Sequence, residues 1–236
     1  MKDLAKRLFD IVSSAAALIT LGPLLLVVAL WIKLDSPGPV FFMQQRAGLC
    51  GRPFRIFKFR TMVHRTPNQI DQYSERVVSE GHDPRITRAG RIIRASSLDE
   101  LPQLLNILKG DMSVVGPRPV LMEQKEVVPP GYIKRFSVRP GLTGLAQVRG
   151  RRSLGWLKQL AFDAEYVEKR SFFYDLSIIL ATVKVVVLGG GIYGGQGLNW
   201  RTYRDSLEGK PPADDDVTSA LAEYEPEINK VKEGQS

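Results

Sequence analysis

Two adjacent carboxylates, Asp99 and Glu100, lie within SSLDELPQLLNILKGDMSVVGPRP, which covers residues 96–119. Neighbouring side chains on a helix point about 100° apart, so two such carboxylates can serve one centre from different directions. One can hold a Mg²⁺ ion that bridges diphosphate oxygens while the other attacks phosphorus in line. Cations stabilise the transferring phosphoryl group in such reactions. The surrounding sequence supplies more cations than two carboxylates need: Arg88, Arg91, Arg94, Lys109 and Arg118.

A plainer interpretation of the same residues is a helix cap. Ser97-Leu98-Asp99-Glu100 fits the capping box S-x-x-E, in which the serine caps a helix and the glutamate reaches back to the serine N–H. Pro102 weighs against this interpretation, because it would fall beyond the first turn of the helix. Arg118 lies between two prolines in GPRP. Such a stiff backbone can hold a guanidinium in a bidentate phosphate geometry, although GPRP can also be a simple loop spacer.

Charge and composition narrow the class of protein. The 236 residues carry a net charge of +8, but the segment from Asp205 onward holds nine acids and three bases, which leaves residues 1–204 at +14. A basic body predicts an anionic partner: nucleic acid, a membrane surface or a phosphorylated small molecule. One cysteine, Cys50, excludes an internal disulfide. With two histidines and one cysteine a zinc site is not expected, so Mg²⁺ is the predicted metal.

An uncharged stretch from Ile11 to Ile32 is long enough, at about 33 Å as a helix, to cross a bilayer. Two features favour a re-entrant hairpin over a spanning helix. Gly22-Pro23 interrupts the stretch near its middle, and both flanks are basic, whereas a spanning helix would place one basic cluster on the wrong side. Because kinked helices also span membranes, the spanning alternative stays open.

The rest of the chain predicts a small catalytic body. VFFMQQR and FRIFKFRTM read as strands, the second with Lys58 on a basic face. RITRAGRIIRASSLDELPQLLNILKG reads as a short basic helix, a break near Ser96-Ser97 and a helix that ends at Gly110. RPGLTGLAQVRGRR (139–152) reads as strand-like. Two later helices, WLKQLAFDAEYVEKR and LSIILATVKVVVL, are candidates to rest on a bilayer surface, with a core helix the equal alternative for the second.

These motifs resemble the bacterial sugar transferase family, the monotopic polyprenyl-phosphate phosphoglycosyl transferases. The resemblance rests on IFKFRTM, SSLDELPQLLNILKGDMSVVGPRP and RPGLTGLAQVRGR in that order, and extends from the N-terminal helix to about Leu188. It implies transfer of a sugar-1-phosphate from a UDP-sugar to undecaprenyl phosphate with release of UMP. It also implies that Asp99 is the nucleophile of a covalent phosphosugar intermediate and that Glu100 binds Mg²⁺. Five basic residues within the motifs are the phosphate-binding candidates: Lys58, Arg94, Arg118, Arg139 and Arg151.

The expected fold class is α/β in the α+β sense, mostly helical. A re-entrant membrane helix with its break at Gly22 and Pro23 (1–34) precedes a catalytic domain (35–203) and an acidic, partly disordered tail (204–236). Expected partners are a UDP-sugar, polyprenyl phosphate and the lipid of the bacterial inner membrane at its cytoplasmic face, with no nucleic acid. The sugar, the pathway, the role of the tail and homo-oligomer formation stay open.

Two other functions compete with this reading. A membrane-anchored, non-enzymatic protein that binds anionic lipid or nucleic acid would explain the basic body equally well. An ordinary glycosyltransferase would use the same donor but release UDP in place of UMP.

Overall fold

The computed structural model describes residues 2–65, 83–150, 154–188 and 199–209. The fold is mixed and mostly helical, with two small two-stranded sheets. Residues 66–82, Arg151, the glycine-rich segment at 189–197 and residues 210–236 lie outside the described residues. The α-helices are α1 (Lys2–Asp35), α2 (Arg88–Ala95), α3 (Gln103–Lys109), α4 (Met122–Glu126), α5 (Leu145–Arg149), α6 (Trp156–Lys169), α7 (Phe172–Leu188) and α8 (Trp200–Leu207). The strands are β1 (Phe41–Ala47), β2 (Pro53–Phe59), β3 (Ser113–Val115) and β4 (Gly141–Thr143), and the 3-10 helices are η1 (Leu49–Gly51), η3 (Leu98–Glu100) and η4 (Pro130–Ser137).

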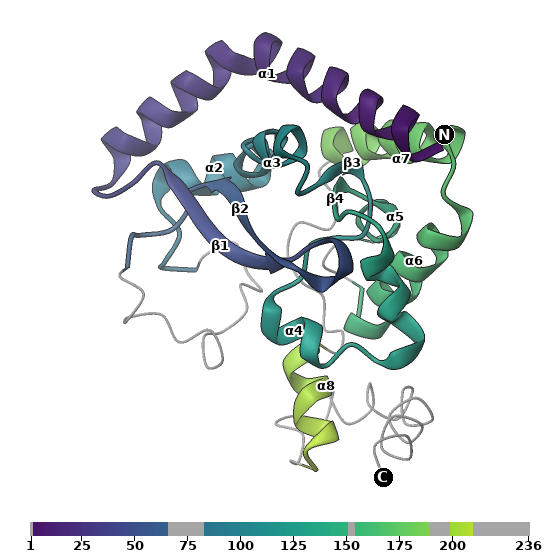
Figure 1. Ribbon diagram of the computed structural model, residues 1–236. Helices are drawn as coiled ribbons and strands as arrows, with labels where there is room; N and C mark the ends of the chain where they lie inside the picture. The colour runs from purple at the N-terminus through teal and green to yellow at the C-terminus, as the bar shows by residue number, and fades with distance from the viewer. Residues whose placement is uncertain (1, 66–82, 151–153, 189–198, 210–236) are drawn as a thin grey trace.

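Helix α1 is long and apolar and passes through Gly22-Pro23 without ending. The expected helix–break–helix is therefore not seen as an interruption of the helix. A proline removes one backbone hydrogen bond and bends a helix without necessarily terminating it. In Figure 1, α1 arches over the domain, and both of its ends approach the same body.

The N-terminal end of α1 is bonded to three elements of the domain. The Arg7 guanidinium donates to the carbonyls of Ile107 and Leu108, the latter at 2.9 Å, at the C-terminal end of α3. Asp10 is buried and accepts a hydrogen bond from the Val114 N–H of β3. Lys6 forms an ion pair with Asp175 of α7; these contacts fix the first turns of α1 to the domain.

The C-terminal end of α1 is also bonded to the domain. Asp35 accepts a hydrogen bond from the Ala89 N–H in the first turn of α2, and the buried Arg60 donates to the carbonyls of Ser36 and Pro37. The apolar contact in this region is a cluster of Val28, Ile32, Phe59, Ala89 and Ile93.

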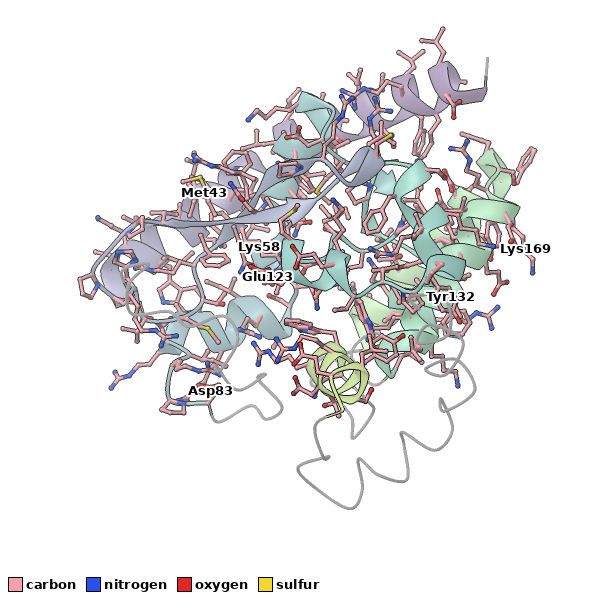
Figure 2. All side chains as sticks on the ribbon, turned by 60° about the horizontal axis from the view of Figure 1, so that its bottom comes forward. Met43, Lys58, Asp83, Glu123, Tyr132 and Lys169 are labelled. Carbon is pink, nitrogen blue, oxygen red and sulfur yellow. The ribbon has the colours of Figure 1, made fainter. Side chains whose placement is uncertain are left out.

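The hairpin of β1 and β2 confirms the two strands expected from the alternating sequence. The strands pair antiparallel, with Phe41 opposite Phe59 and Ala47 opposite Pro53. Strand β2 buries Ile56 on one face and Phe59 on the other, and its Lys58 lies beside the carboxylate pair. Figure 2 labels Lys58 beside this hairpin.

The segment at 139–152 differs from the strand-like expectation. Only Gly141–Thr143 forms a strand, which pairs parallel with β3, and Leu145–Arg149 forms helix α5. Leucine, alanine, glutamine and arginine are strong helix formers, so α5 follows local propensity once the extended Gly144 has ended the strand.

Helices α6 and α7 have different surroundings. Trp156, Leu157 and Leu160 of α6 are at most 5% exposed, so these apolar residues pack against the domain, and the expectation that α6 rests on a bilayer surface is not confirmed. Helix α7 instead leaves a row of apolar residues exposed, and its first residue, Phe172, meets Phe9 of α1 edge to face at 5.8 Å. Exposed apolar residues of α7 include Phe172, Phe173, Leu176, Leu180, Val183 and Val187.

Helix α8 crosses the boundary that we expected between residues 203 and 204. Its Trp200 and Tyr203 are buried in the cluster that also contains Trp156 and Leu160 of α6. The side of the domain that faces away from α1 is thus completed by this C-terminal helix (Figure 1).

Candidate active site

The Asp99–Glu100 pair lies on the 3-10 helix η3, between α2 and α3. Helix α2 ends at Ala95, and Ser97 then adopts the left-handed conformation with φ of 59°. Helix α3 begins after Pro102, because a proline suits the start of a helix, where its missing N–H is not needed. The two carboxylates therefore lie on a tight turn rather than within an α-helix, and their directions differ by about 120° instead of 100°.

The capping-box interpretation is wrong for this turn. The Ser97 side chain makes no capping hydrogen bond. The Glu100 carboxylate turns away from Ser97 and binds Lys58 and Arg118. The turn is thus held by contacts with distant parts of the chain.

Two cations share the Glu100 carboxylate. Lys58 Nζ lies 2.7 Å from Glu100 Oε1, and Arg118 Nη2 lies 2.8 Å from the same oxygen. The second oxygen, Oε2, is 3.5 Å from Arg118 Nη1 and is the less engaged of the two. The side chains of Lys58 and Glu100 are 15% and 19% exposed, so water screens this cluster only partly.

The Asp99 carboxylate has a different environment. Across the described parts of the chain, no group forms a hydrogen bond or ion pair with it. Burial raises the pKa of Asp99, and the negative charge of Glu100 raises it further. The nearby positive charges of Lys58, Arg94 and Arg118 oppose this rise. Because no donor holds them, the lone pairs of an ionised Asp99 are free, which is what a nucleophile requires.

The pKa of Glu100 moves in the opposite direction to that of Asp99. Burial alone would raise the pKa of Glu100, but Arg118 and Lys58 outweigh this effect and hold that pKa well below its usual range. Glu100 in turn raises the pKa of Arg118. For Lys58, burial lowers the pKa despite the attraction of Glu100. Two adjacent carboxyl groups with pKa values moved in opposite directions are typical of a division of catalytic roles.

A buried asparagine fixes the strand that carries Lys58 against the helix that follows the turn. Asn106 is fully buried. Its Oδ1 accepts a hydrogen bond of 2.9 Å from the Phe57 N–H, and its Nδ2 donates one of 2.7 Å to the Arg55 carbonyl. Because α3 begins directly after η3, this bridge sets the distance between Lys58 and Glu100. Sequence reasoning missed Asn106, since its position in an apolar helix gives no sign of a partner in β2.

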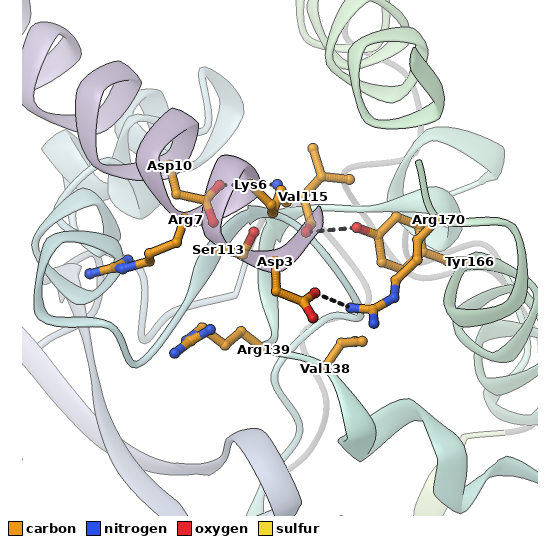
Figure 3. Close-up of a pocket in the computed structure, with 10 residues that line it drawn as sticks. All are labelled: Asp3, Lys6, Arg7, Asp10, Ser113, Val115, Val138, Arg139, Tyr166 and Arg170. Atoms are coloured by element: carbon orange, nitrogen blue, oxygen red, sulfur yellow. Dashed lines mark hydrogen bonds and ion pairs between the residues drawn. The ribbon is translucent and has the colours of Figure 1, made fainter. Parts of the chain in front are cut away.

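The other three predicted phosphate-binding residues, Arg94, Arg139 and Arg151, do not lie together. Arg94, in the last turn of α2, is close enough to Asp99 to lower its pKa. Arg139 lines a second, open pocket, with Ser113 and Arg170 among its other walls (Figure 3). Its Nε donates to the Gly110 carbonyl at 2.8 Å. Arg151 lies outside the described residues.

Two residues not predicted from the sequence line the cleft at Glu100. Arg46 of β1 and the buried Gln103 of α3 form its walls together with Lys58, Glu100 and Arg118. Arg46 belongs to the basic flank of the apolar stretch in the sequence, and only the hairpin brings it to the site. With Arg46 and Arg94 the cations exceed the carboxylates, so the site favours an anion such as a diphosphate.

The donors suit a magnesium ion that binds together with a phosphate substrate. Among the described residues, no three carboxylate, imidazole or thiolate groups could hold a metal by themselves. Mg²⁺ commonly uses one or two carboxylates and completes its shell with water and substrate phosphates. Glu100 Oε2, the oxygen less engaged by Arg118, is one oxygen that such an ion could use, and the adjacent Asp99 carboxylate supplies others, so the residues fit such an ion.

Comparisons with known proteins agree with this geometry. The bacterial sugar transferase family matches residues 1–189. A UDP-glucose:undecaprenyl-phosphate glucose-1-phosphate transferase of Caulobacter vibrioides is 46% identical over 81% of this chain and 73% of its own length. The exopolysaccharide production protein PSS of Rhizobium leguminosarum is 46% identical over 75% of this chain and 92% of its own. The exopolysaccharide production protein ExoY of Rhizobium meliloti is 38% identical over 80% and 88%.

The structure combines a long apolar helix with a domain that holds a carboxylate pair among cations. Together with these relatives, this places the protein in the class of phosphoglycosyl transferases. The chain belongs to the bacterial sugar transferase family.

Proposed function

We propose that the protein transfers a sugar-1-phosphate from a UDP-sugar to undecaprenyl phosphate, releases UMP, and does so through a covalent intermediate on Asp99. The observation that carries this proposal is the contrast within the pair: Glu100 is clamped by two cations, whereas the Asp99 carboxylate has no hydrogen-bond donor among the described residues. UDP-glucose is the donor to test first, because the named Caulobacter relative uses it.

The first half-reaction follows from the position of the charges. An Asp99 oxygen attacks the phosphorus that carries the sugar, and the bond from that phosphorus to the bridging oxygen breaks. UMP leaves with the electron pair, and the sugar phosphate stays on Asp99 as an acyl phosphate. Arg118 and Lys58, which lie within 2.8 Å of Glu100, and Arg94 stabilise the charge on the diphosphate as it transfers.

The second half-reaction reverses the roles of the groups. A phosphate oxygen of undecaprenyl phosphate attacks the same phosphorus, the bond to Asp99 breaks, and the carboxylate is regenerated. The product is a polyprenyl diphosphate sugar. Mg²⁺, when bound at Glu100, would supply a further positive charge on the diphosphate.

Support for a one-sided membrane attachment comes from the two ends of α1. Arg7 near the start and Asp35 at the end both bond to the same domain, so the helix could cross a bilayer only if the domain crossed with it. We infer that α1 is re-entrant and that its exposed apolar face, with Leu8, Ile19 and Val27, lies in one leaflet. Helix α7 extends this apolar face from its contact at Phe9.

The cytoplasmic face of the inner membrane suits this arrangement, because UDP-sugars are made in the cytoplasm and basic flanks favour that side. The active-site cleft then lies near the headgroups, where undecaprenyl phosphate presents its anion.

Identification of the released nucleotide tests the function. The purified protein, in detergent or nanodiscs, is incubated with UDP-glucose, Mg²⁺ and undecaprenyl phosphate. Release of UMP supports phosphoglycosyl transfer. Release of UDP would instead indicate an ordinary glycosyltransferase, and release of neither nucleotide with any UDP-sugar of a panel would favour a lipid-binding protein.

A further inference from the structure

Arg118 lies on a loop whose backbone carbonyls are held from three directions. The Pro117 carbonyl accepts a hydrogen bond of 2.8 Å from the Gly141 N–H of β4. The Arg118 carbonyl accepts one of 2.7 Å from Arg135 Nη2, and the Pro119 carbonyl accepts one of 3.4 Å from Arg46 Nη1. Because the prolines have no N–H, these carbonyls are the loop's principal means of attachment.

The middle contact belongs to a buried ion pair. Arg135 of η4 and Asp163 of α6 are 3% and 2% exposed. Arg135 Nη2 lies 2.7 Å from Asp163 Oδ2 and Arg135 Nε lies 3.1 Å from it. The same Nη2 that binds the carboxylate also binds the Arg118 carbonyl. The planar guanidinium thereby connects α6 to the loop in a fixed geometry.

The charge of Asp163 is balanced mainly by Arg135. Burial raises the pKa of Asp163, while the Arg135 guanidinium opposes that rise. Within the described residues, neither Arg135 nor Asp163 bonds to Asp99 or Glu100. The pair therefore reaches the carboxylates only through Arg118, whose Nη2 is 2.8 Å from Glu100.

We propose that Arg135 and Asp163 are positioning residues that set the place of the Arg118 guanidinium at the catalytic carboxylates. The inference rests on the proposed function, in which Arg118 binds the diphosphate. Such a site is sensitive to small displacements, and a shift of about 1 Å can cost on the order of 100-fold in rate. Buried ion pairs often contribute little net stability compared with apolar residues. Stability alone therefore does not account for this pair, whereas placement of the Arg118 loop does.

The structure offers a matched control for this pair. Lys134 and Glu168 form an ion pair between the same two elements, η4 and α6. Their side chains are 41% and 60% exposed, and the pair has no hydrogen bond to the Arg118 loop among the described residues. If Arg135 and Asp163 only joined η4 to α6, the loss of either pair would affect the site in the same way.

A double-mutant cycle tests the inference. Arg135→Lys and Asp163→Asn are each made in the wild-type background and in Arg118→Ala, with Lys134→Ala as the control. We expect each conservative substitution to lower kcat/KM about 10- to 100-fold in the wild-type background and to have no further effect in Arg118→Ala. Lys134→Ala should leave kcat/KM within about 2-fold of wild type. Losses that add fully in the Arg118→Ala background would overturn the inference.

A binding measurement separates this inference from the proposed function and from misfolding. Calorimetric titration with UDP-glucose and Mg²⁺ yields the same cycle in Kd without any turnover when every protein, the reference included, also carries Asp99→Asn, which prevents the covalent step. The variants used are those whose thermal unfolding is cooperative. If Arg135→Lys does not fold, the test uses Asp163→Asn, because this substitution keeps the size of the side chain. Coupling in Kd supports the positioning role even if the wild type releases no UMP. In the Asp99→Asn background, binding by Asp163→Asn equal to that of the Asp99→Asn parent would overturn it.

Discussion

Lys58 Nζ and Arg118 Nη2 lie 2.7 Å and 2.8 Å from one oxygen of Glu100, Oε1, although the two cations are far apart in the chain. The β1–β2 hairpin brings one and the proline-flanked loop brings the other. The adjacent Asp99 is left without a donor among the described residues. The two cations thus bind the Glu100 carboxylate and leave the Asp99 carboxylate free to act as the proposed nucleophile.

Asp99→Asn should abolish turnover and stabilise the fold at neutral pH. Because the pKa of Asp99 is raised above its ordinary 3.8 by burial and Glu100, ionisation of Asp99 destabilises the folded state as the pH rises above about 3.8 through the raised pKa. We expect the variant to gain on the order of 1 kcal/mol at pH 7, a few degrees in Tm. Thermal unfolding at several pH values checks this. A variant that is less stable than wild type at pH 7 would contradict the environment assigned to Asp99.

Glu100→Gln should have the opposite effect on stability. The cations hold the pKa of Glu100 well below its ordinary 4.5, so the stabilisation is present above about pH 4.5 and is lost as the pH falls through the folded-state pKa. We expect a loss of about 1–2 kcal/mol at pH 7, between the values for exposed and buried pairs. Denaturant unfolding at pH 7 and at acid pH measures it, and an unchanged free energy of unfolding at pH 7 would count against the clamp.

Lys58→Ala should reduce kcat/KM on the order of 100-fold, because it removes a cation from the transferring phosphoryl group. Arg55→Ala is the matched control: Arg55 lies on the same strand but is exposed, and its carbonyl bond to Asn106 is a backbone contact that alanine retains. Steady-state kinetics with UDP-glucose should show a large loss only for Lys58→Ala. Equal losses in the two variants would mean that general positive charge, rather than the position of Lys58, matters.

The sequence specifies much of this fold but little of how the site is held together. The alternation in FRIFKFRTM predicts β2, and the left-handed Gly110 ends α3 as expected. The turn geometry at Asp99 was not predictable, because Ser97 adopts a left-handed conformation under tertiary constraint. The bonds from Asn106 and Arg135 join segments 49 and 17 residues apart, and a single sequence gives residue types without such pairings.

The two attached ends of α1 predict that both lie on the cytoplasmic side. Asp3→Cys and Lys33→Cys are each made in a Cys50→Ser background, so that each protein carries one thiol at one end of α1. The wild-type protein, labelled separately at its exposed Cys50, reports the side of the membrane on which the domain lies. A membrane-impermeant maleimide should label all three positions in inverted vesicles and none in intact spheroplasts. Labelling of Asp3→Cys from outside would show that the helix spans the membrane.

Capture of the covalent intermediate tests the central claim most directly. The protein is incubated with UDP-glucose labelled in its glucose, and with Mg²⁺ but no lipid acceptor, then denatured and analysed by autoradiography and peptide mass spectrometry. We predict one hexose phosphate on the peptide that contains Asp99, its loss on later addition of undecaprenyl phosphate to the native enzyme, and no adduct in Asp99→Asn. An enzyme that makes lipid product but carries no label, or carries it on another residue, would contradict the account.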